Sequence, residues 1–113
     1  MTPFAVIKRD DGGGVSRLLI SGELDEDTGE GMAGLIANAA TQSDVWELVV
    51  DLRRVTFLSA AGVRALLYGR DAAIGAGCAF RVVNAIGLVY QVLRISGVHQ
   101  RLAVTCEPAA TTP

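Results

Sequence analysis

The sequence predicts a single α/β domain built on a mixed, mostly parallel sheet with an antiparallel hairpin at its N-terminal end and three main helices. Extended apolar runs alternate with stretches of helical periodicity, in the order ββαβαβαβ. Strands separated by helices pair in parallel through right-handed crossovers. The chain has 113 residues, half of them hydrophobic, which fits one domain with its own core and excludes disorder over most of its length.

The predicted hairpin comes first. Phe4–Arg9 is typical of an edge strand, with Phe4 and Val6 on one side and Ala5, Ile7 and Arg9 on the other. Asp10–Gly14 is the turn, because glycine adopts positive φ without a steric penalty. Val15–Ser21 is the second strand. The glycines indicate a turn and not a phosphate-binding loop, since no Lys-Ser/Thr pair follows them.

A helix is expected over residues 26–42. Asp25 or Asp27 would cap it, and the acidic residues of its first turn suit the helix dipole. Apolar residues recur at helical spacing on the face that would meet the core: Met32, Leu35, Ile36 and Ala39.

The middle of the chain predicts a buried strand followed by a second helix. Val45–Leu52 has a continuous apolar run, which suits burial on both faces of a parallel sheet. Arg53–Leu58 is expected to be a short loop. Ser59 then begins a helix that runs to about Ile74, with an apolar face formed by Val63, Leu66, Leu67 and Ile74.

The last third predicts a strand at Cys78–Val83, a helix at Ile86–Ser96 and a short final strand at Arg101–Thr105. The domain would cover residues 1–107, and residues 108–113 would form a flexible tail. Cys78 and Cys106 would lie at opposite ends of two strands, too far apart for a disulfide, so we expect two unpaired thiols.

Composition excludes several classes of function. One His and two Cys are too few for a common zinc site, and we expect neither metal nor cofactor. No apolar stretch approaches the ~20 residues that span a bilayer, and the first residues lack the basic-then-apolar order of a signal peptide. The sequence therefore predicts a cytoplasmic protein that does not insert into membranes, with reduced thiols.

Charge is unevenly distributed along the chain. Residues 1–52 hold ten acidic and three basic residues, a net −7, whereas residues 53–113 hold two acidic residues and seven arginines, a net +5. The whole chain carries −2, which argues against general nucleic-acid binding because that function needs a concentrated basic face.

An enzyme is also not indicated. Ser59, His99 and Asp51 could be named as a catalytic triad, but Ser59 does not lie in a Gly-x-Ser-x-Gly turn. Asp51 is expected at a strand end, where acids sometimes bind metal, yet no second aspartate stands near it in the sequence. We expect no catalytic residue.

The most informative stretch is Val50–Leu67, in which a buried strand leads through Phe57-Leu58 to a helix that opens with Ser-Ala-Ala-Gly. Here the chain resembles the STAS domain family, which includes anti-sigma factor antagonists and the cytoplasmic tails of sulfate transporters. Ile20–Asp25 is similar to the family's GELD strand end, and Val49–Leu67 is similar to its vlDlsgvtfiDSsGlgaLl motif. The motif order and the ββαβαβαβ pattern agree, and the resemblance implies a STAS fold over nearly the whole chain.

The resemblance implies an anti-sigma factor antagonist, a non-enzymatic protein that binds an anti-sigma factor and so frees a sigma factor. In switchable members a kinase-type anti-sigma factor phosphorylates a serine at the start of the second helix, and the added charge and bulk prevent docking. Aligning Gly62 with the motif glycine places Ala60 at that serine and Ser59 at the preceding aspartate. Ala60 has no hydroxyl, so the standard switch is absent; Ser59 or Thr56 is a possible substitute, although Ser59 is also well placed as a helix N-cap.

The resemblance further implies a partner-binding surface for the kinase-like anti-sigma factor. Its expected residues are Asp25, Phe57, Leu58, Ser59, Ala60, Ala61, Gly62 and Arg64. The arginines at positions 53, 54, 64 and 70 would form either a basic docking rim or an ordinary solvated face. An exposed apolar surface at Phe57-Leu58 could also support a homodimer.

Two other functions remain open at this point. The chain could be a STAS subunit of an ABC transporter or of a larger signalling assembly, or a sensor that binds a nucleotide or another small ligand, a role that the resemblance also allows.

Overall fold

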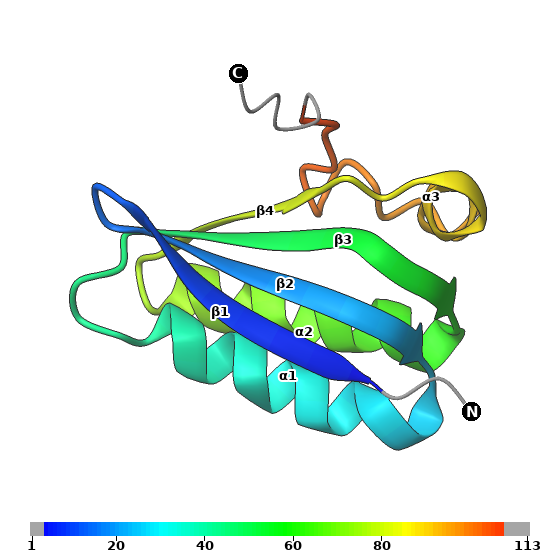
Figure 1. Cartoon of the computed structure of the whole chain (residues 1–113), viewed down its shortest axis with the longest axis horizontal. Helices are drawn as coiled ribbons and strands as arrows, with labels where there is room; N and C mark the ends of the chain where they lie inside the picture. The colour runs from blue at the N-terminus through cyan, green and yellow to red at the C-terminus, as the bar shows by residue number, and fades with distance from the viewer. Residues whose placement is uncertain (1–3, 108–113) are drawn as a thin grey trace.

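The computed structural model describes residues 4–107 and contains one four-stranded sheet. The strands are β1 (Ala5–Gly12), β2 (Val15–Leu24), β3 (Glu47–Leu58) and β4 (Ala79–Val83), and they lie in the sheet in that order. β1 is antiparallel to β2, and the other two pairs are parallel, as Figure 1 shows. The predicted α/β class and the mixed sheet are confirmed.

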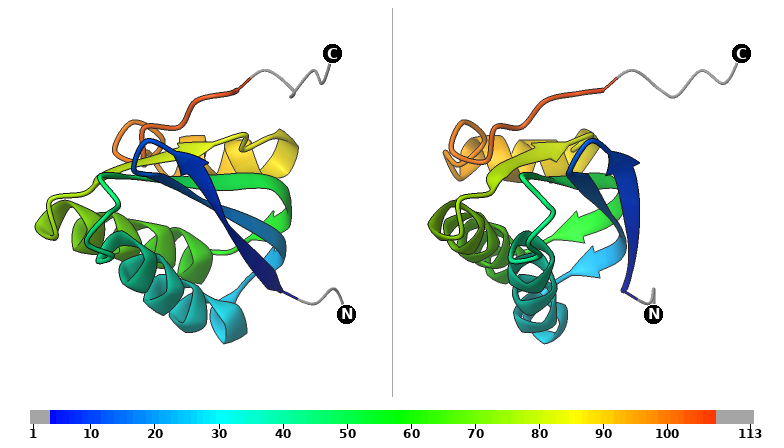
Figure 2. Two further views of the ribbon diagram at one scale, coloured as in Figure 1. Left: turned by 60° about the vertical axis from the view of Figure 1, so that its left-hand side comes forward. Right: turned by 90° about the vertical axis from the view of Figure 1, so that its left-hand side faces the viewer.

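Three helices accompany the sheet: α1 (Glu26–Ala40), α2 (Ala60–Gly75) and α3 (Gly87–Ile95). α1 and α2 pack side by side on one face of the sheet (Figures 1 and 2). α3 lies on the β4 side of the molecule, away from that pair, and contacts β3 (Figure 2). One face of the sheet is therefore covered by two helices, and most of the other face is not.

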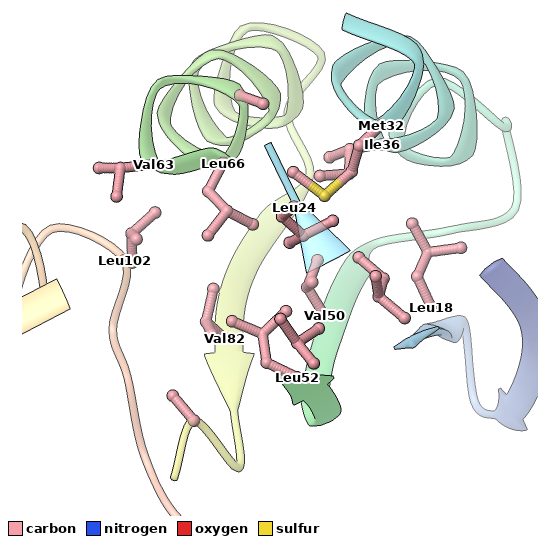
Figure 3. Packing of buried hydrophobic residues seen from close by; sticks show 14 of the residues in the cluster. Leu18, Leu24, Met32, Ile36, Val50, Leu52, Val63, Leu66, Val82 and Leu102 are labelled. Carbon is pink, nitrogen blue, oxygen red and sulfur yellow. The ribbon is translucent and has the colours of Figure 1, made fainter. Parts of the chain in front are cut away.

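The hydrophobic core lies between the sheet and the α1–α2 pair. Met32 and Ile36 of α1 and Leu66 of α2 are completely buried, and they point toward Leu24 and Val50 of the sheet (Figure 3). Burying a side chain of this size contributes roughly 1.5–3 kcal/mol.

The predicted periodicity agrees with the buried face of α1 at Met32, Ile36 and Ala39, but the expectation is wrong for Leu35, which is 44% exposed. Ile74, at the end of the apolar face predicted for α2, is exposed as well, so each predicted stripe is wider than the face that the core covers.

The expected loop at Arg53–Leu58 is wrong, because these residues continue β3. Two β-bulges explain the difference, since the register with β2 shifts once after Asp51 and again after Val55. Each bulge adds a residue to β3, so the residues that face the core are Leu52, Val55 and Leu58, three apart instead of two. The alternation of buried and exposed residues that marks a regular strand is therefore lost, although the strand continues to Leu58. As a result, Asp51 lies inside β3 and not at its end.

The expected final strand at Arg101–Thr105 is also not formed. Residues 99–103 make a turn in which the amide of Leu102 donates to the carbonyl of Val98, and Ala103 has a φ of +50°. That left-handed residue interrupts the extended backbone. Only Thr105 reaches β4, where it forms an isolated parallel bridge with Val83.

Cys78 is buried, Cys106 is exposed, and both are free, as expected. No helix within residues 4–107 is long and apolar enough to cross a bilayer. The predicted tail at residues 108–113 lies outside the described residues.

Candidate functional site

The N-terminal ends of α1 and α2 lie together because of the sheet topology. β2 and β3 are parallel, and their last residues, Leu24 and Leu58, are partners in the ladder. Each strand leads directly into a helix, and the amide of Ser59 donates to the carbonyl of Leu24 at 2.9 Å. This arrangement places Asp25 and Ser59 at one end of the molecule, although they are 34 positions apart in the sequence. Both are among the residues that the family resemblance implies for partner binding.

Asp25 is the N-cap of α1. Its carboxylate accepts hydrogen bonds from the amides of Asp27, at 3.0 Å, and Thr28, at 3.2 Å. The Thr28 hydroxyl also lies 3.0 Å from the Asp25 amide and accepts from it, which completes a capping box. The carboxylate of Asp25 therefore has a structural role within its own helix.

Ser59 is the N-cap of α2, as the sequence indicates. Its Oγ accepts a hydrogen bond from the amide of Gly62 at 3.2 Å. The side chain satisfies one of the four amides that lack a partner at a helix start. Ser59 is half-buried, and its hydroxyl oxygen is engaged in the cap.

Two glycines allow the backbones to approach closely at this end. A Cβ on Gly62 would lie 2.7 Å from the carbonyl oxygen of Leu24 and 2.6 Å from a methyl group of Leu58. A Cβ on Gly29 of α1 would lie 3.2 Å from the carbonyl oxygen of Ala61. Gly62 is thus needed for α2 to pack against the end of β2.

Exposed residues precede and follow the start of α2. Thr56 and Phe57 are exposed at the end of β3, and Phe57 leaves 43% of its surface accessible. Ala60 and Arg64 are exposed on α2, four residues apart and therefore on one face of the helix. We call these four residues the α2 entry surface.

Two of the residues implied as partner-binding are internal. Leu58 is 4% exposed and belongs to the core, so the expectation of an exposed Phe57-Leu58 pair is wrong for Leu58. The reason is the second β-bulge, which turns Leu58 inward and leaves Thr56 and Phe57 outside. Gly62 is buried as well, and Ala61 is half-buried.

The four arginines do not form one rim. Arg53 and Arg54 line a groove on the sheet face opposite α1 and α2. Arg64 belongs to the α2 entry surface. Arg70 turns toward the C-terminal segment, where its Nε donates to the carbonyl of Arg101 at 2.7 Å. Only Arg64 is available beside the start of α2.

The possible triad of Ser59, His99 and Asp51 is not assembled. Ser59 caps α2, and Asp51 is held by other residues, as described next. The Nδ1 atom of His99 is buried and has no hydrogen-bond partner within residues 4–107. Nothing in this arrangement activates the Ser59 hydroxyl as a nucleophile.

A polar cluster that the sequence does not predict lies on the open face of the sheet. Arg17 of β2 is its centre, and its side chain is 9% exposed. Its guanidinium donates to Asp11 at 2.7 Å, to Asp51 at 3.2 Å and to both carboxylate oxygens of Glu107, at 2.8 and 3.1 Å. These partners come from three distant parts of the chain. We call Arg17, Asp11, Asp51, Asn84 and Glu107 the Arg17 cluster.

Asn84 completes the cluster. It has a φ of 62° and is 2% exposed. Its side-chain amide donates to Asp51 at 3.1 Å, and its side-chain carbonyl accepts from the amide of Glu107 at 2.9 Å. Asn84 therefore connects the end of β4 to the segment that crosses the open face of the sheet.

The ion pairs shift the titration of the cluster. The hydrogen bond to Glu107 raises the pKa of Arg17 above its ordinary value, against the opposing effect of burial. The same bond lowers the pKa of Glu107 below 4.5, also against burial. Burial by itself would raise the pKa of Asp11, but hydrogen bonds from Arg17 and Arg9 lower it overall. All three groups are held in their charged forms.

Comparison with known proteins adds to this geometry. A family model described as "Mlab, STAS domain" matches residues 7–105. No curated protein sequence matches the chain. Among solved structures, an anti-sigma factor antagonist from Mycobacterium paratuberculosis is 24% identical, with a TM-score of 0.79, and the match covers 96% of this chain and 88% of that one.

Two further structures are similar. The anti-sigma factor antagonist SpoIIAA in its unphosphorylated form is 19% identical, with a TM-score of 0.76, over 92% of this chain and 89% of that one. A sulfate transporter family protein from Wolinella succinogenes is 18% identical, with a TM-score of 0.72, over 86% and 80% of the two chains. At these identities the structures show a shared fold, and the fold occurs in both antagonists and transporters.

Proposed function

This chain belongs to the STAS domain family, and we propose that it is a non-enzymatic regulatory protein that binds an anti-sigma factor through the start of α2. The observation that carries the proposal is the exposed Ala60 on the first turn of α2, between exposed Phe57 and exposed Arg64. The fold is shared with two anti-sigma factor antagonists, one of them SpoIIAA. In this proposal Phe57 supplies apolar contact area and Arg64 supplies charge to the partner.

The proposed docking is not controlled by phosphorylation at the usual position. Ala60 stands where the family resemblance places the phosphorylated serine, and it has no hydroxyl. The oxygen of the neighbouring Ser59 accepts a hydrogen bond from the Gly62 amide, so this hydroxyl already has a structural role as the cap of α2. We infer a permanently competent antagonist, or one controlled by the supply of its partner.

A charge introduced at Ala60 tests the surface directly. We expect Ala60→Glu to prevent binding of the cognate anti-sigma factor, because a carboxylate would meet the partner where a phosphate would otherwise stand. The variant should fold, since acidic residues in the first turn favour the helix dipole. Gln91→Glu adds the same charge to an exposed position of α3 and should bind like the original chain. Equal binding by both variants and the original chain would contradict the proposed surface.

A gain-of-function experiment tests the missing switch. We expect a kinase-type anti-sigma factor from the same cell to leave residues 56–61 of the original chain unmodified and to phosphorylate Ala60→Ser. Intact-mass spectrometry with peptide mapping gives the result. Stoichiometric modification of Ser59 or Thr56 in the original chain would contradict the unswitched mechanism.

A second candidate function is a STAS subunit of a transporter assembly. A sulfate transporter family protein shares the fold of this chain. Affinity capture from the native cell distinguishes the two. A kinase-like anti-sigma factor would support the first function, and a transporter ATPase or permease would support the second.

A further inference from the structure

A hollow lies on the open face of the sheet, and none of the residues that line it belongs to the α2 entry surface. It has a volume of about 820 Å³ and is bordered by β1, β2, β3 and the end of the chain segment that carries Glu107. That volume is within the roughly 300–1,000 Å³ typical of small-molecule sites. We call it the open-face groove.

The floor of the groove includes an apolar pair. Ile7 of β1 and Leu19 of β2 are direct partners across the antiparallel ladder, and both line the groove. Ile7 is 64% exposed, although it is a large aliphatic residue on a strand. An apolar group that lay on this pair would remove that surface from water.

The rim of the groove carries positive charge without a partner. The first β-bulge places Arg53 and Arg54 next to each other between the buried residues Leu52 and Val55, so both arginines are exposed. Neither guanidinium forms an ion pair within residues 4–107, whereas the Arg9 side chain pairs with Asp11. Two neighbouring unpaired guanidiniums are suited to a carboxylate or a phosphate, which they can bind through paired hydrogen bonds.

The acidic residues of the groove do not cancel this charge. Asp51 and Glu107 line it, but both accept hydrogen bonds from Arg17, and Asp51 also accepts from Asn84. Against these two carboxylates, the groove is lined by four arginines, at positions 9, 17, 53 and 54, so its lining carries a net charge of +2. Of these four, Arg53 and Arg54 form no ion pair within residues 4–107, and they are the ones available to a ligand.

The apolar pair and the two arginines are close enough together for one small molecule to contact both. Ser21 lies opposite Arg54, and Leu19, two residues earlier on β2, lies opposite Ile7. Two residues of a strand span about 7 Å. We propose that the open-face groove binds a small amphiphilic anion, with its carboxylate or phosphate head on Arg53 and Arg54 and its apolar group on Ile7 and Leu19.

The proposal is tested by titrating the isotope-labelled chain with octyl phosphate and octanoate and following backbone amide chemical shifts. We expect saturable shifts confined to residues that line the groove, with a dissociation constant on the order of 0.1 mM for at least one probe. Octanol and inorganic phosphate should each bind at least about tenfold more weakly, because each offers only one of the two interactions.

Variants locate the site. The double variant Arg53→Gln with Arg54→Gln should weaken binding roughly tenfold or more, since it removes both charged donors. Arg94→Gln removes an exposed arginine from α3 and should bind like the original chain. Both changes are on the surface, so the amide spectrum of each variant reports whether the fold is retained.

Four results would overturn the proposal: no saturable shift with either amphiphile, equal binding of octanol, equal binding of inorganic phosphate, or equal weakening by Arg94→Gln. Binding of a tetraglutamate peptide as tightly as the amphiphiles would also overturn it, because the groove would then be a site for acidic protein segments. The α2 entry surface plays no part in the experiment, so either proposal can fail alone.

Discussion

The two faces of the sheet are stabilised by different interactions. The face toward α1 and α2 is apolar. Val50 on this face and Leu66 on α2 are both completely buried. The opposite face carries the Arg17 cluster, in which one guanidinium contacts three carboxylates. Stability on the first face depends on packing, whereas on the second face ion pairs contribute beside buried apolar residues such as Val49.

The difference between the two faces predicts which interactions make the stability of the protein depend on pH. Apolar burial has no titrating group, whereas the Arg17 cluster requires ionised carboxylates. It also separates two types of surface: the α2 entry surface is at the end of the packed layer, and the open-face groove lies beside the Arg17 cluster.

The largest effect is expected from Arg17→Met. The substitution leaves the buried Asp51 without its cation and leaves Asp11 and Glu107 with only their more exposed partners, Arg9 and Arg81. It should lower the free energy of unfolding by about 3–5 kcal/mol. Urea denaturation at pH 7 measures it. Arg9→Met is the matched control, because Arg9 lies opposite Arg17 in the ladder but its side chain is 55% exposed. A loss equal to that of Arg9→Met would show that the cluster contributes no stability.

The second largest effect is expected from Leu66→Ala. It should lower the free energy of unfolding by about 3 kcal/mol, because it leaves a cavity between α2 and the sheet. The loss should be the same at pH 5 and pH 7, because no titrating group is involved. Leu67→Ala, at the half-buried neighbouring position, should cost clearly less. A loss for Leu66→Ala that changed with pH would break the distinction between the two faces.

Glu107→Gln is expected to cost about 1–2 kcal/mol at pH 7, less than a fully buried hydrogen bond to a charged group because the Glu107 side chain is 28% exposed. The pKa of Glu107 is lower in the folded chain than its ordinary value of 4.5. Its stabilising effect is therefore complete above about pH 5 and is lost as the pH falls through the folded-state pKa. The stability curves of the original chain and the variant should converge in acid, and parallel curves would exclude the ion pair as the cause. Asp71→Asn, at a 62% exposed side chain, is the control.

The smallest effect is expected from Ser59→Ala, with a loss of about 1 kcal/mol from the missing cap of α2. Ser59→Asp should keep most of the stability, because a carboxylate also accepts from the helix amides. Ser96→Ala, at the exposed C-cap of α3, should change little. If Ser59→Ala were neutral in thermal unfolding, the hydroxyl would not be needed as a cap and would be available for another role.

The sequence predicted the elements that bury one regular face. α1 and α2 were expected within two residues of their observed bounds, because each has an apolar stripe and an N-cap, at Asp25 and Ser59. It failed at β3, where two bulges change the spacing of the buried residues from two to three. It also failed at residues 101–105, where a left-handed Ala103 interrupts an apparently extended run.

The candidate site also contains one part that the sequence indicated and one part that it did not. The start of α2 was indicated by a local motif, and the structure places Ala60 and Arg64 on its surface and Leu58 in the core. The Arg17 cluster had no local signal. Its contacts join residues that are 34 and 90 positions apart, and neither hydropathy nor spacing reports such pairs.

By itself the sequence determined the α/β class, the hairpin, the helix caps and the absence of a hydroxyl at Ala60, because each depends on residue type and short-range periodicity. Only the tertiary structure decided that Phe57 faces outward while Leu58 faces inward, that Arg53 and Arg54 stand together over the open face of the sheet, and that Glu107 pairs with Arg17. Those outcomes depend on strand register and on contacts between distant segments, which are fixed only when the sheet is assembled.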